Sequence, residues 1–551
     1  MSTDFAKAVV KEYEWLTEPQ KLLGEVDWLF ANTLSNSNSK RPNFVLAYLF
    51  FAARRGFLSL SIDAQKLSVQ PDFSELLIAL EPAAEQKLKK LFWEDWQKLS
   101  FDHITDHPSE EIPLKPVVWE DHKLFLQKNY IYQKQIIKHL KRLDSSPPTD
   151  LFQRSLLDRL ASLPKNLSQQ QKLAIQNAFE HNLTIIWGGP GTGKTFTAAV
   201  FADLFSIDAI NPPKILALAP TGKAALHLKK TIEQKLTSTV EMIGMTIHAA
   251  LQLNPKKDPL FGKQRKLKAD LIIVDETSMI DARLMAYLLD AIDERTRLVF
   301  LGDPDQLPPV ENVDLSTFFQ PFALKTIFLK ENYRFKNEAF QKTLSALRKK
   351  DKAAFIQTLD NFSIVKPELV FQAQNSIVEK VFQTYNKLFS GKTDPEELLE
   401  CLESFRLLSA LKVGPLGTHS LNEKIWECFR LQKTEFPFPI VITQNDYQQN
   451  LFNGEIGFFF NKAAYFRDEE QKSINGNSIK RVPAYLLPSY NLGYALSVHK
   501  SQGSEYQEIC LVLPEKSEVF GLKLLYTAIT RAKTKASLFA FEKTLDRMFE
   551  N

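Results

Sequence analysis

Short runs of apolar and β-branched residues alternate with longer amphipathic stretches from about residue 165 onward. The first runs cover residues 183–187, 215–219, 271–274 and 297–301, and the pattern resumes at 405–410, 509–513 and 537–541. Short buried strands separated by helical stretches are typical of parallel sheets with crossover helices. The sequence therefore predicts an α/β fold with two such units, over about 151–335 and 336–551.

Two regions depart from this pattern. Residues 1–150 interleave Trp and Phe with Lys and Glu, which predicts a mostly helical N-terminal domain. Residues 430–490 carry Pro437 and Pro439, the turn pairs 453–454 and 475–476, and many aromatic or β-branched positions. An Asn-Gly pair between such positions favours a β-hairpin. We therefore expect a small β insertion within the second unit.

Composition excludes some classes of protein. The 551 residues carry a net charge of only +4, so any nucleic-acid surface must be local. The cysteines, Cys401, Cys428 and Cys510, lack metal-ligand spacing, which favours a reducing, cytoplasmic compartment. The longest apolar run, 45–53, is too short to span a bilayer, and no signal peptide is expected at the start.

A glycine-rich segment follows the first apolar run directly. It is the pattern G-x-x-x-x-G-K-[ST], which predicts a loop whose N–H groups and following helix bind phosphates. Lys194 would reach the β- and γ-phosphates of a nucleoside triphosphate, and the Thr195 hydroxyl would ligate Mg²⁺. A glycine-rich turn without a ligand is the alternative. The expected loop residues are Gly188, Gly189, Pro190, Gly191, Thr192, Gly193, Lys194 and Thr195.

Two further strands end in polar residues. Asp275 and Glu276 follow the run 271–274, at the edge of a parallel sheet where ligands bind. Asp275 would hold the hydration shell of Mg²⁺, and Glu276 would deprotonate the attacking water. An acidic helix cap is the alternative. Gln306, after the run 297–301, is a candidate sensor of the γ-phosphate, although its segment alone is a turn.

Three more segments complete a recurring order of motifs: 331–334, 495–505 and 524–533. Each alone has an ordinary explanation as an exposed ion pair, a loop or an amphipathic helix. Together with the preceding motifs they resemble the superfamily 1 helicases, from Leu167 to the end of the chain. The resemblance implies two RecA-like domains, with the β insertion of an SH3-like kind.

The resemblance also implies roles for single residues. Gln171 would read the adenine edge, and Tyr333 would stack on the adenine. Arg334 and Arg531 match the two arginine fingers, and Glu505 matches the acidic residue near the ribose. Because the phosphate loop and Arg531 fall in different units, ATP would be held in a cleft that closes around it.

Contacts to a nucleic-acid strand are implied for four residues, Thr221, His248, His499 and Lys500. For His248, a buried histidine bonded to a backbone carbonyl is the alternative. The basic segment at about 252–269 lies where this family carries a strand-separating pin, and a solvated loop is the alternative.

A closer resemblance is to the RecD subfamily, the alpha subunits of exodeoxyribonuclease V. The segments 219–225, 275–281, 406–422, 442–446 and 451–457 carry it, whereas Pro304 and Pro308-Pro309 depart from familiar members. It implies an ATP- and Mg²⁺-dependent 5′–3′ DNA helicase that acts on single strands and duplex ends in double-strand-break repair and recombination.

The same resemblance implies assembly with RecB-like and RecC-like subunits. Residues 43–60 resemble the N-terminal domain that docks on RecC, and an ordinary helical core is the alternative. Two other functions stay open: a stand-alone helicase of this type, and an ATP-dependent switch that regulates a partner nuclease.

Overall fold

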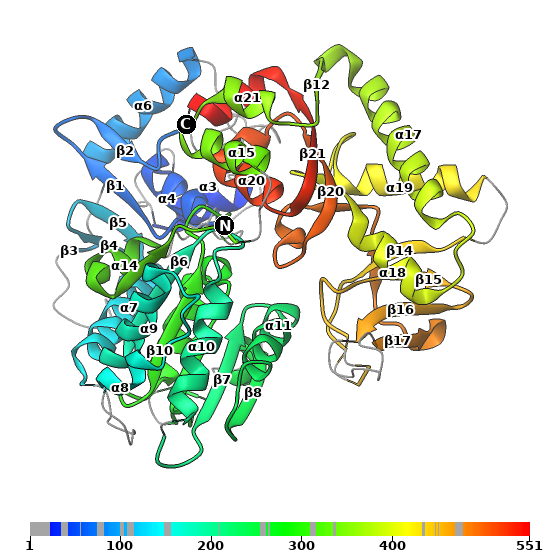
Figure 1. Ribbon diagram of the computed structural model, residues 1–551. Coiled ribbons are helices and arrows are strands. Elements are labelled where there is room, and N and C mark those ends of the chain that lie inside the picture. Colours follow the sequence, from blue (N-terminus) through cyan, green and yellow to red (C-terminus); the bar gives the residue numbers. More distant parts are fainter. Residues whose placement is uncertain are drawn as a thin grey trace.

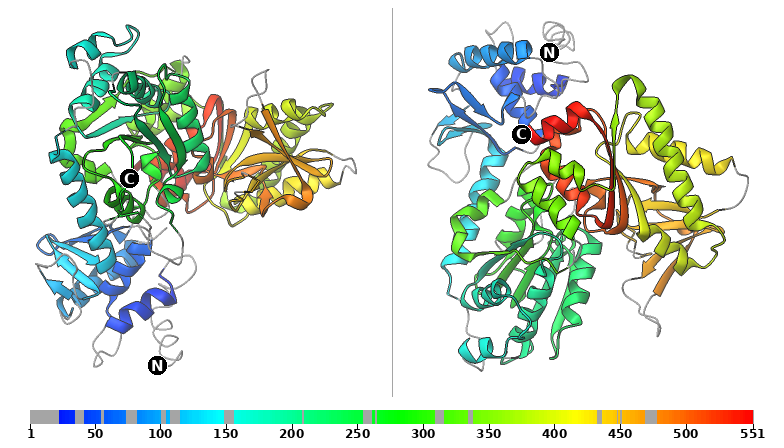
Figure 2. Two further views of the ribbon diagram at one scale, coloured as in Figure 1. Left: turned by 90° about the horizontal axis from the view of Figure 1, so that it is seen from below. Right: turned by 45° about the horizontal axis from the view of Figure 1, so that its top comes forward.

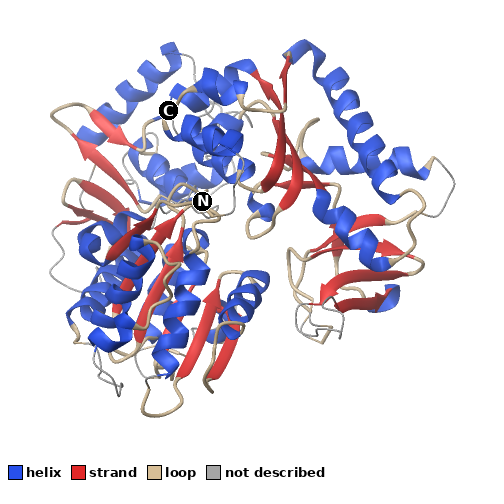
Figure 3. Cartoon of the chain, in the orientation of Figure 1, coloured by secondary structure: helices blue, strands red, loops and turns tan. Residues whose placement is uncertain are grey.

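The computed structural model of the protein is shown in Figure 1. It describes residues 23–34, 42–54, 57–73, 82–99, 104–106, 115–147, 156–207, 209–253, 261–262, 265–308, 316–333, 338–431, 436–446, 448–449, 451–468 and 478–550. The chain forms an N-terminal region, two α/β units and a β insertion, which Figure 3 colours by secondary structure. In both views of Figure 2, strands of the second unit lie between the N-terminal region and the β insertion.

The N-terminal region contains a sheet that the sequence pattern did not predict. Its order is β2-β1-β5-β4-β3, and the only parallel pair is β3 with β4. The strands are β1 (Ser59–Asp63), β2 (Ser68–Gln70), β3 (Ile104–Asp106), β4 (Val117–Glu120) and β5 (Lys123–Leu126); the helices are α3 (Glu25–Leu34), α4 (Phe44–Arg54), α6 (Pro82–Gln97) and α7 (Gln127–Ser145). Helices still cover more of the described region than strands do, but the expectation of a mostly helical domain did not include this sheet, because strands of three to five residues give little periodic signal.

Helix α4 contains the apolar run 45–53 and forms the interior of this region. Phe44, Tyr48 and Phe51 are buried with Phe73 and Phe92 in one aromatic cluster. Most of the run is therefore core, as the ordinary alternative held, and docking of this region on a partner stays a prediction. Within the described residues, no helix is long and apolar enough to cross a membrane.

Helix α7 joins the N-terminal region to the first α/β unit. Arg142 donates to the carbonyls of Leu289 and Ile292 at 3.1 and 2.7 Å, and Ile136 and Leu140 enter the core of that unit. His139 lies 3.4 Å from a carboxylate oxygen of Asp290. Burial lowers the pKa of His139 to about 4, so this contact is made by the neutral ring at neutral pH.

The first α/β unit contains a six-stranded sheet of order β11-β6-β10-β9-β7-β8, in which every pair is parallel. The strands are β6 (Leu183–Gly188), β7 (Lys214–Ala219), β8 (Glu241–Thr246), β9 (Leu271–Val274), β10 (Arg297–Gly302) and β11 (Thr326–Leu329); the helices are α8 (Leu156–Ala161), α9 (Gln169–Glu180), α10 (Lys194–Ile207), α11 (Gly222–Glu233), α12 (Ile247–Ala250), α13 (Ala282–Ala291) and α14 (Ser316–Phe319). Strands β6 and β9 flank β10, so the polar loops after these three strands lie side by side.

The second unit contains a parallel sheet of order β12-β21-β20-β13-β19. The strands are β12 (Asn361–Val365), β13 (Phe405–Ser409), β19 (Ala495–Ser497), β20 (Tyr506–Leu513) and β21 (Ala532–Phe541); the helices are α15 (Glu338–Arg348), α16 (Lys352–Gln357), α17 (Val370–Phe389), α18 (Pro395–Ser404), α19 (Thr418–Arg430), α20 (Gly521–Ile529) and α21 (Glu542–Glu550). The two parallel sheets confirm the predicted α/β class.

The insertion is an antiparallel sheet of order β17-β16-β15-β14-β18. Its strands are β14 (Phe438–Ile442), β15 (Ile456–Phe460), β16 (Ala463–Asp468), β17 (Ser478–Pro483) and β18 (Tyr490–Leu492). A β module is thus present where the turn residues indicated it. Its SH3-like kind and the domain boundaries at 150 and 335 stay predictions.

Candidate nucleotide and nucleic-acid sites

The phosphate loop lies between the end of β6 at Gly188 and the start of α10 at Lys194. Gly191 and Gly193 have φ angles of +77° and +82°, which glycine adopts without strain. The Lys194 Nζ donates to the carbonyl oxygens of Gly188 and Gly189 at 2.8 and 3.2 Å. Thr192 closes the turn by donating to the Gly189 carbonyl at 2.9 Å. The amine is therefore held beside the loop, where a phosphate could replace the two carbonyl oxygens as its hydrogen-bond partner.

The base-binding candidates lie against the same loop. Gln171 is in the first turn of α9, where its side chain accepts from the Ser168 N–H at 3.0 Å. Its amide nitrogen would be 2.6 Å from a Cβ on Gly193, so the glycine makes room for it. The N–H of Tyr333 donates to the Gly191 carbonyl at 2.8 Å, and 48% of Tyr333 is exposed. The structure thus brings Gln171 and an open aromatic face together at the loop.

The metal-binding candidates also meet. The Thr195 hydroxyl donates to Asp275 Oδ2 at 3.3 Å, and the Glu276 N–H donates to Asp275 Oδ1 at 2.7 Å. A hydroxyl and a carboxylate beside a phosphate site are the few protein ligands that Mg²⁺ needs, because water and phosphate oxygens supply the rest. Among the described residues, no cluster of three or more His, Cys, Asp or Glu side chains could hold a metal by itself. The donor set therefore fits Mg²⁺ bound with a nucleotide.

Glu276 has the geometry and the environment of a strained, half-buried acid. Its φ of +51° is in the left-handed region, which costs a non-glycine residue about 1–3 kcal/mol. Burial is the main cause that raises the pKa of its carboxyl, and Asp275 adds to it. The positive charges of Arg531 and Lys194 act in the opposite direction. Positive charges from both α/β units therefore lower the pKa of this one carboxyl.

Gln306 lies in the loop after β10 and is 5% exposed. Its amide donates to Asp303 Oδ2 at 3.4 Å, whereas its Oε1 is buried without a hydrogen-bond partner in the described structure. Unpartnered buried acceptors are uncommon because they cost stability. This orphan oxygen suits an acceptor for a water beside a γ-phosphate.

The second unit contributes Arg531, which is 4% exposed. Its guanidinium donates to the carbonyls of Thr527 and Ser504 at 3.1 and 3.4 Å and to the Thr530 hydroxyl at 3.3 Å. These acceptors are neutral, so the bonds orient the charge without cancelling it. The other expected finger, Arg334, lies outside the described residues.

Several hydrogen bonds join the two units near Gln306. The Leu307 N–H donates to the Thr527 hydroxyl at 2.7 Å, and the Gln502 amide donates to the Leu307 carbonyl at 3.1 Å. The Tyr526 hydroxyl donates to Asp303 Oδ2 at 3.1 Å. Sequence reasoning missed Tyr526 and its neighbour Arg348. The only signal was that Tyr526 lies in a recognised motif.

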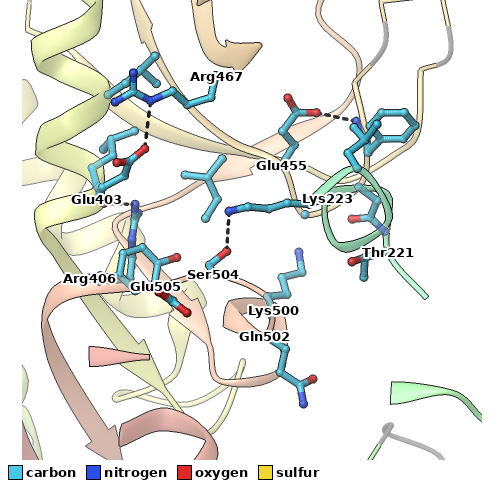
Figure 4. Close-up of a pocket in the computed structure, with 18 of the residues that line it drawn as sticks. Thr221, Lys223, Glu403, Arg406, Glu455, Arg467, Lys500, Gln502, Ser504 and Glu505 are labelled. Atoms are coloured by element: carbon cyan, nitrogen blue, oxygen red, sulfur yellow. Dashed lines mark hydrogen bonds and ion pairs between the residues drawn. The ribbon is translucent and has the colours of Figure 1, made fainter. Parts of the chain in front are cut away.

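A cavity of about 350 Å³ lies between the first unit, the second unit and the β insertion. Thr221 and Lys500 line it (Figure 4), and so does His499; contact of these residues with a strand stays a prediction. Across it, Lys223 Nζ of the first unit donates to the Ser504 hydroxyl of the second at 3.1 Å. Glu505 also lines this cavity and lies 3.8 Å from the Lys533 ammonium.

His248 is placed differently. It lies in α12 with an exposed side chain, so the alternative of a buried, carbonyl-bonded histidine is wrong. It does not line the cavity. Half of the expected pin at 252–269, residues 254–260 and 263–264, lies outside the described residues. Within the described part, Lys266 pairs with Asp290, so it is not a freely solvated charge.

A second cavity, of about 470 Å³, adjoins the first. Lys500 lines both, and Lys412, His419 and Tyr490 line the second. Burial, followed by the charge of Lys412, lowers the pKa values of both His499 and Lys500. The ammonium groups of Lys412 and Lys500 repel one another beside an open cavity, which favours a polyanionic ligand.

Two family models match this chain over the spans that hold the candidate residues. The family model of the AAA domain matches residues 171–312, and that of the UvrD-like helicase C-terminal domain matches 492–539. The first span holds the phosphate loop with Asp275, Glu276 and Gln306, and the second holds Arg531. A structure of Bacteroides Pif1 bound to single-stranded DNA is similar at 18% identity and a TM-score of 0.38, over 69% of this chain and 94% of that one.

Curated relatives give a more specific result. The RecBCD enzyme subunit RecD of Buchnera aphidicola (subsp. Acyrthosiphon pisum, strain APS) is 26% identical over 96% of this chain and 97% of its own. The ATP-dependent RecD2 DNA helicase of Deinococcus radiodurans is 30% identical over 73% of this chain but 53% of its own. The RecBCD enzyme subunit RecD of Mycolicibacterium smegmatis is 31% identical over 68% of this chain and 71% of its own. The chain therefore belongs to the RecD family, and it is an ATP-hydrolysing DNA helicase.

Proposed function

We propose that the protein is the alpha subunit of a RecBCD-type complex and moves 5′ to 3′ along single-stranded DNA. It would act at duplex ends, with RecB-like and RecC-like subunits, in double-strand-break repair and homologous recombination. The observation that carries the motor is the site at Glu276, where Lys194 of the first unit and Arg531 of the second act on one carboxyl.

The mechanism follows from that arrangement. Lys194 would leave the loop carbonyls and bind the phosphates, while Gln171 and Tyr333 would hold the base. Thr195 and Asp275 would hold Mg²⁺, which neutralises phosphate charge. Glu276 would take a proton from the attacking water, and the two cations favour its ionised form against the opposing effects of burial and Asp275. Arg334 and Arg531 would stabilise the charge that develops during phosphoryl transfer.

Movement requires that the nucleotide distinguish an open seam from a closed one. A ligand shifts such an equilibrium only by its differential affinity. ATP makes contacts with Arg531 only in the closed seam, and hydrolysis removes them. Because Thr221 and Lys223 belong to one unit and His499 and Lys500 to the other, closure would also change the grip on a strand. His248, which lies outside this cavity, would contact the strand farther along.

Similarity to a RecD subunit over almost the whole chain supports the subunit proposal. The protein spans nearly all of the Buchnera RecD relative but about half of the Deinococcus RecD2 relative. The N-terminal region would supply the docking surface for a RecC-like partner. The free cysteines favour a reducing compartment, which we propose is the cytoplasm.

The test is unwinding of forked DNA that carries either a 5′ or a 3′ single-stranded tail. We expect the chain alone to unwind only the 5′-tailed fork, and co-expressed RecB-like and RecC-like chains to copurify with it. Unwinding of the 3′-tailed fork alone would contradict the proposed direction. Unwinding without any stable association would favour the stand-alone alternative, and partner regulation without unwinding would favour the ATP switch.

A further inference from the structure

Helix α15 of the second unit ends at Arg348, directly at the seam. The Arg348 Nε donates to Asp305 Oδ2 at 3.0 Å, and its Nη2 donates to the Tyr526 hydroxyl at 3.3 Å. The guanidinium carbon also lies 5.6 Å from the centre of the Tyr526 ring. One side chain thus contacts the loop after β10 and helix α20.

The same side chain lies against the phosphate loop. A Cβ placed on Gly189 would be 2.9 Å from the Tyr526 hydroxyl and 3.4 Å from Arg348 Nη2. The Gly189 carbonyl in turn accepts from Lys194 Nζ at 3.2 Å. A change of the loop at Gly189, such as release of Lys194 towards a phosphate, would therefore alter the packing of Arg348 and Tyr526 against it.

The partners of Arg348 lead to two groups that act on the nucleotide. Asp303 and Asp305 hold the turn that carries Gln306, since the Asp305 N–H donates to Asp303 Oδ1 at 3.1 Å and Gln306 donates to Asp303. Tyr526 lies on α20, five positions before Arg531, and donates to Asp303 Oδ2 at 3.1 Å. Arg348 thus completes a chain of contacts between Gln306 and the helix that leads to Arg531.

We propose that Arg348 is a positioning residue that couples the phosphate loop to Gln306 and α20 through Asp305 and Tyr526. Its planar fork suits two acceptors at a fixed angle, which a lysine ammonium cannot reproduce. Burial raises the pKa of Asp303 and the positive charge of Lys194 lowers it, whereas Asp303 and Asp305 both raise the pKa of Arg348. This role concerns ATP turnover and is independent of strand polarity and of partner subunits.

The proposal predicts an effect on turnover rather than on ATP affinity. For Arg348→Gln we expect kcat to fall about tenfold to a hundredfold, as for a lost orienting contact, while KM for ATP changes less than about threefold. Arg348→Lys should recover part of the rate through Asp305. Lys349→Gln, one position on and exposed, is the matched control and should turn over ATP normally.

A double-mutant cycle with Asp305→Asn separates positioning from direct contact. If Arg348 acts through Asp305, the kcat of the double variant should lie within about threefold of the kcat of the slower single variant. Fully multiplicative losses would overturn the proposal, and so would a change confined to KM, which would indicate direct binding of ATP. Should Arg348→Gln fail to fold, the same cycle is made with Arg348→Lys and Tyr526→Phe. Failure of unwinding with normal ATP turnover would bear on the proposed function instead.

Discussion

Replacement of Arg531 by glutamine tests whether the second unit supplies charge to a reaction on the first. Glutamine can keep one or two of the three hydrogen bonds that Arg531 makes to Thr527, Ser504 and Thr530, but it removes the charge. The variant therefore isolates electrostatics from packing better than alanine, which would leave all three acceptors unpaired.

The expected loss of rate is large. The guanidinium is 4% exposed and bound only to neutral oxygens in its described contacts, so its charge is little screened. An arginine in this position of a phosphoryl-transfer site contributes about 10³–10⁵ in rate, which is about 4–7 kcal/mol of the barrier. The lost hydrogen bonds cost only about 1–3 kcal/mol of stability.

A second effect has a definite sign. Arg531 is one of two cations that lower the pKa of Glu276, against burial and Asp275, which raise it. Removing Arg531 must raise that pKa further. In the proposed mechanism Glu276 acts as a carboxylate, so we expect activity above its pKa and loss of activity as pH falls through it. The acid limb of the pH–rate profile should therefore move to higher pH in the variant.

Single-turnover hydrolysis with saturating single-stranded DNA measures the rate, and titration with a fluorescent nucleotide measures binding. We expect binding within about fivefold of the parent, because most ground-state contacts belong to the first unit. Arg531→Lys, which keeps a charge, should fall between the parent and the glutamine variant. A near-normal rate with an unshifted acid limb would refute the placement of this charge at the catalytic site.

Four further outcomes are expected. Lys194→Gln should abolish hydrolysis with the melting temperature unchanged, and unimpaired turnover would reject the phosphate-loop assignment. Gly193→Ala places a Cβ 2.6 Å from the Gln171 amide at a φ of +82°, so titration should show ATP binding about tenfold or more weaker. As pH falls from 6.5 towards 4, the parent should lose at most about 2 kcal/mol of stability, because the unfolded chain binds a proton at His139 before the folded chain does. His139→Gln should remove this loss, as measured by denaturant titration at several pH values. Lys412→Ala should weaken binding of single-stranded DNA and reduce the slope of log affinity against log salt concentration by about 0.7. An unchanged slope would count against strand binding in the second cavity, which Lys412 lines.

The catalytic loops were predictable because their chemistry is local in sequence. Each follows a buried strand, and the strand order places β6, β10 and β9 side by side. A motif after each strand was therefore enough to predict that Lys194, Asp275 and Gln306 converge. That Arg531 acts on the same site could be predicted only from the resemblance to helicases, because no local sequence pattern determines how the two units face each other.

Other features were hidden for the same physical reason. Arg348 is the first residue of a run of three basic residues, which from sequence is indistinguishable from a solvated helix end. Its function depends on contacts with Asp305 and Tyr526, which are 43 and 178 positions away. The N-terminal sheet was missed because its strands are short and are paired across helices and loops.

The structure also indicates why hydrolysis and strand binding should depend on each other. Ser504 takes part in both sites: its hydroxyl accepts from Lys223 across the strand cavity, and its carbonyl accepts from Arg531. A phosphate of the strand that displaced Lys223 from Ser504 would leave the carbonyl of the same residue holding the arginine. Occupancy of the cavity and the position of Arg531 are thus linked through one residue rather than through a long path. We therefore expect single-stranded DNA in this cavity to change the rate of ATP turnover through the contacts of Ser504.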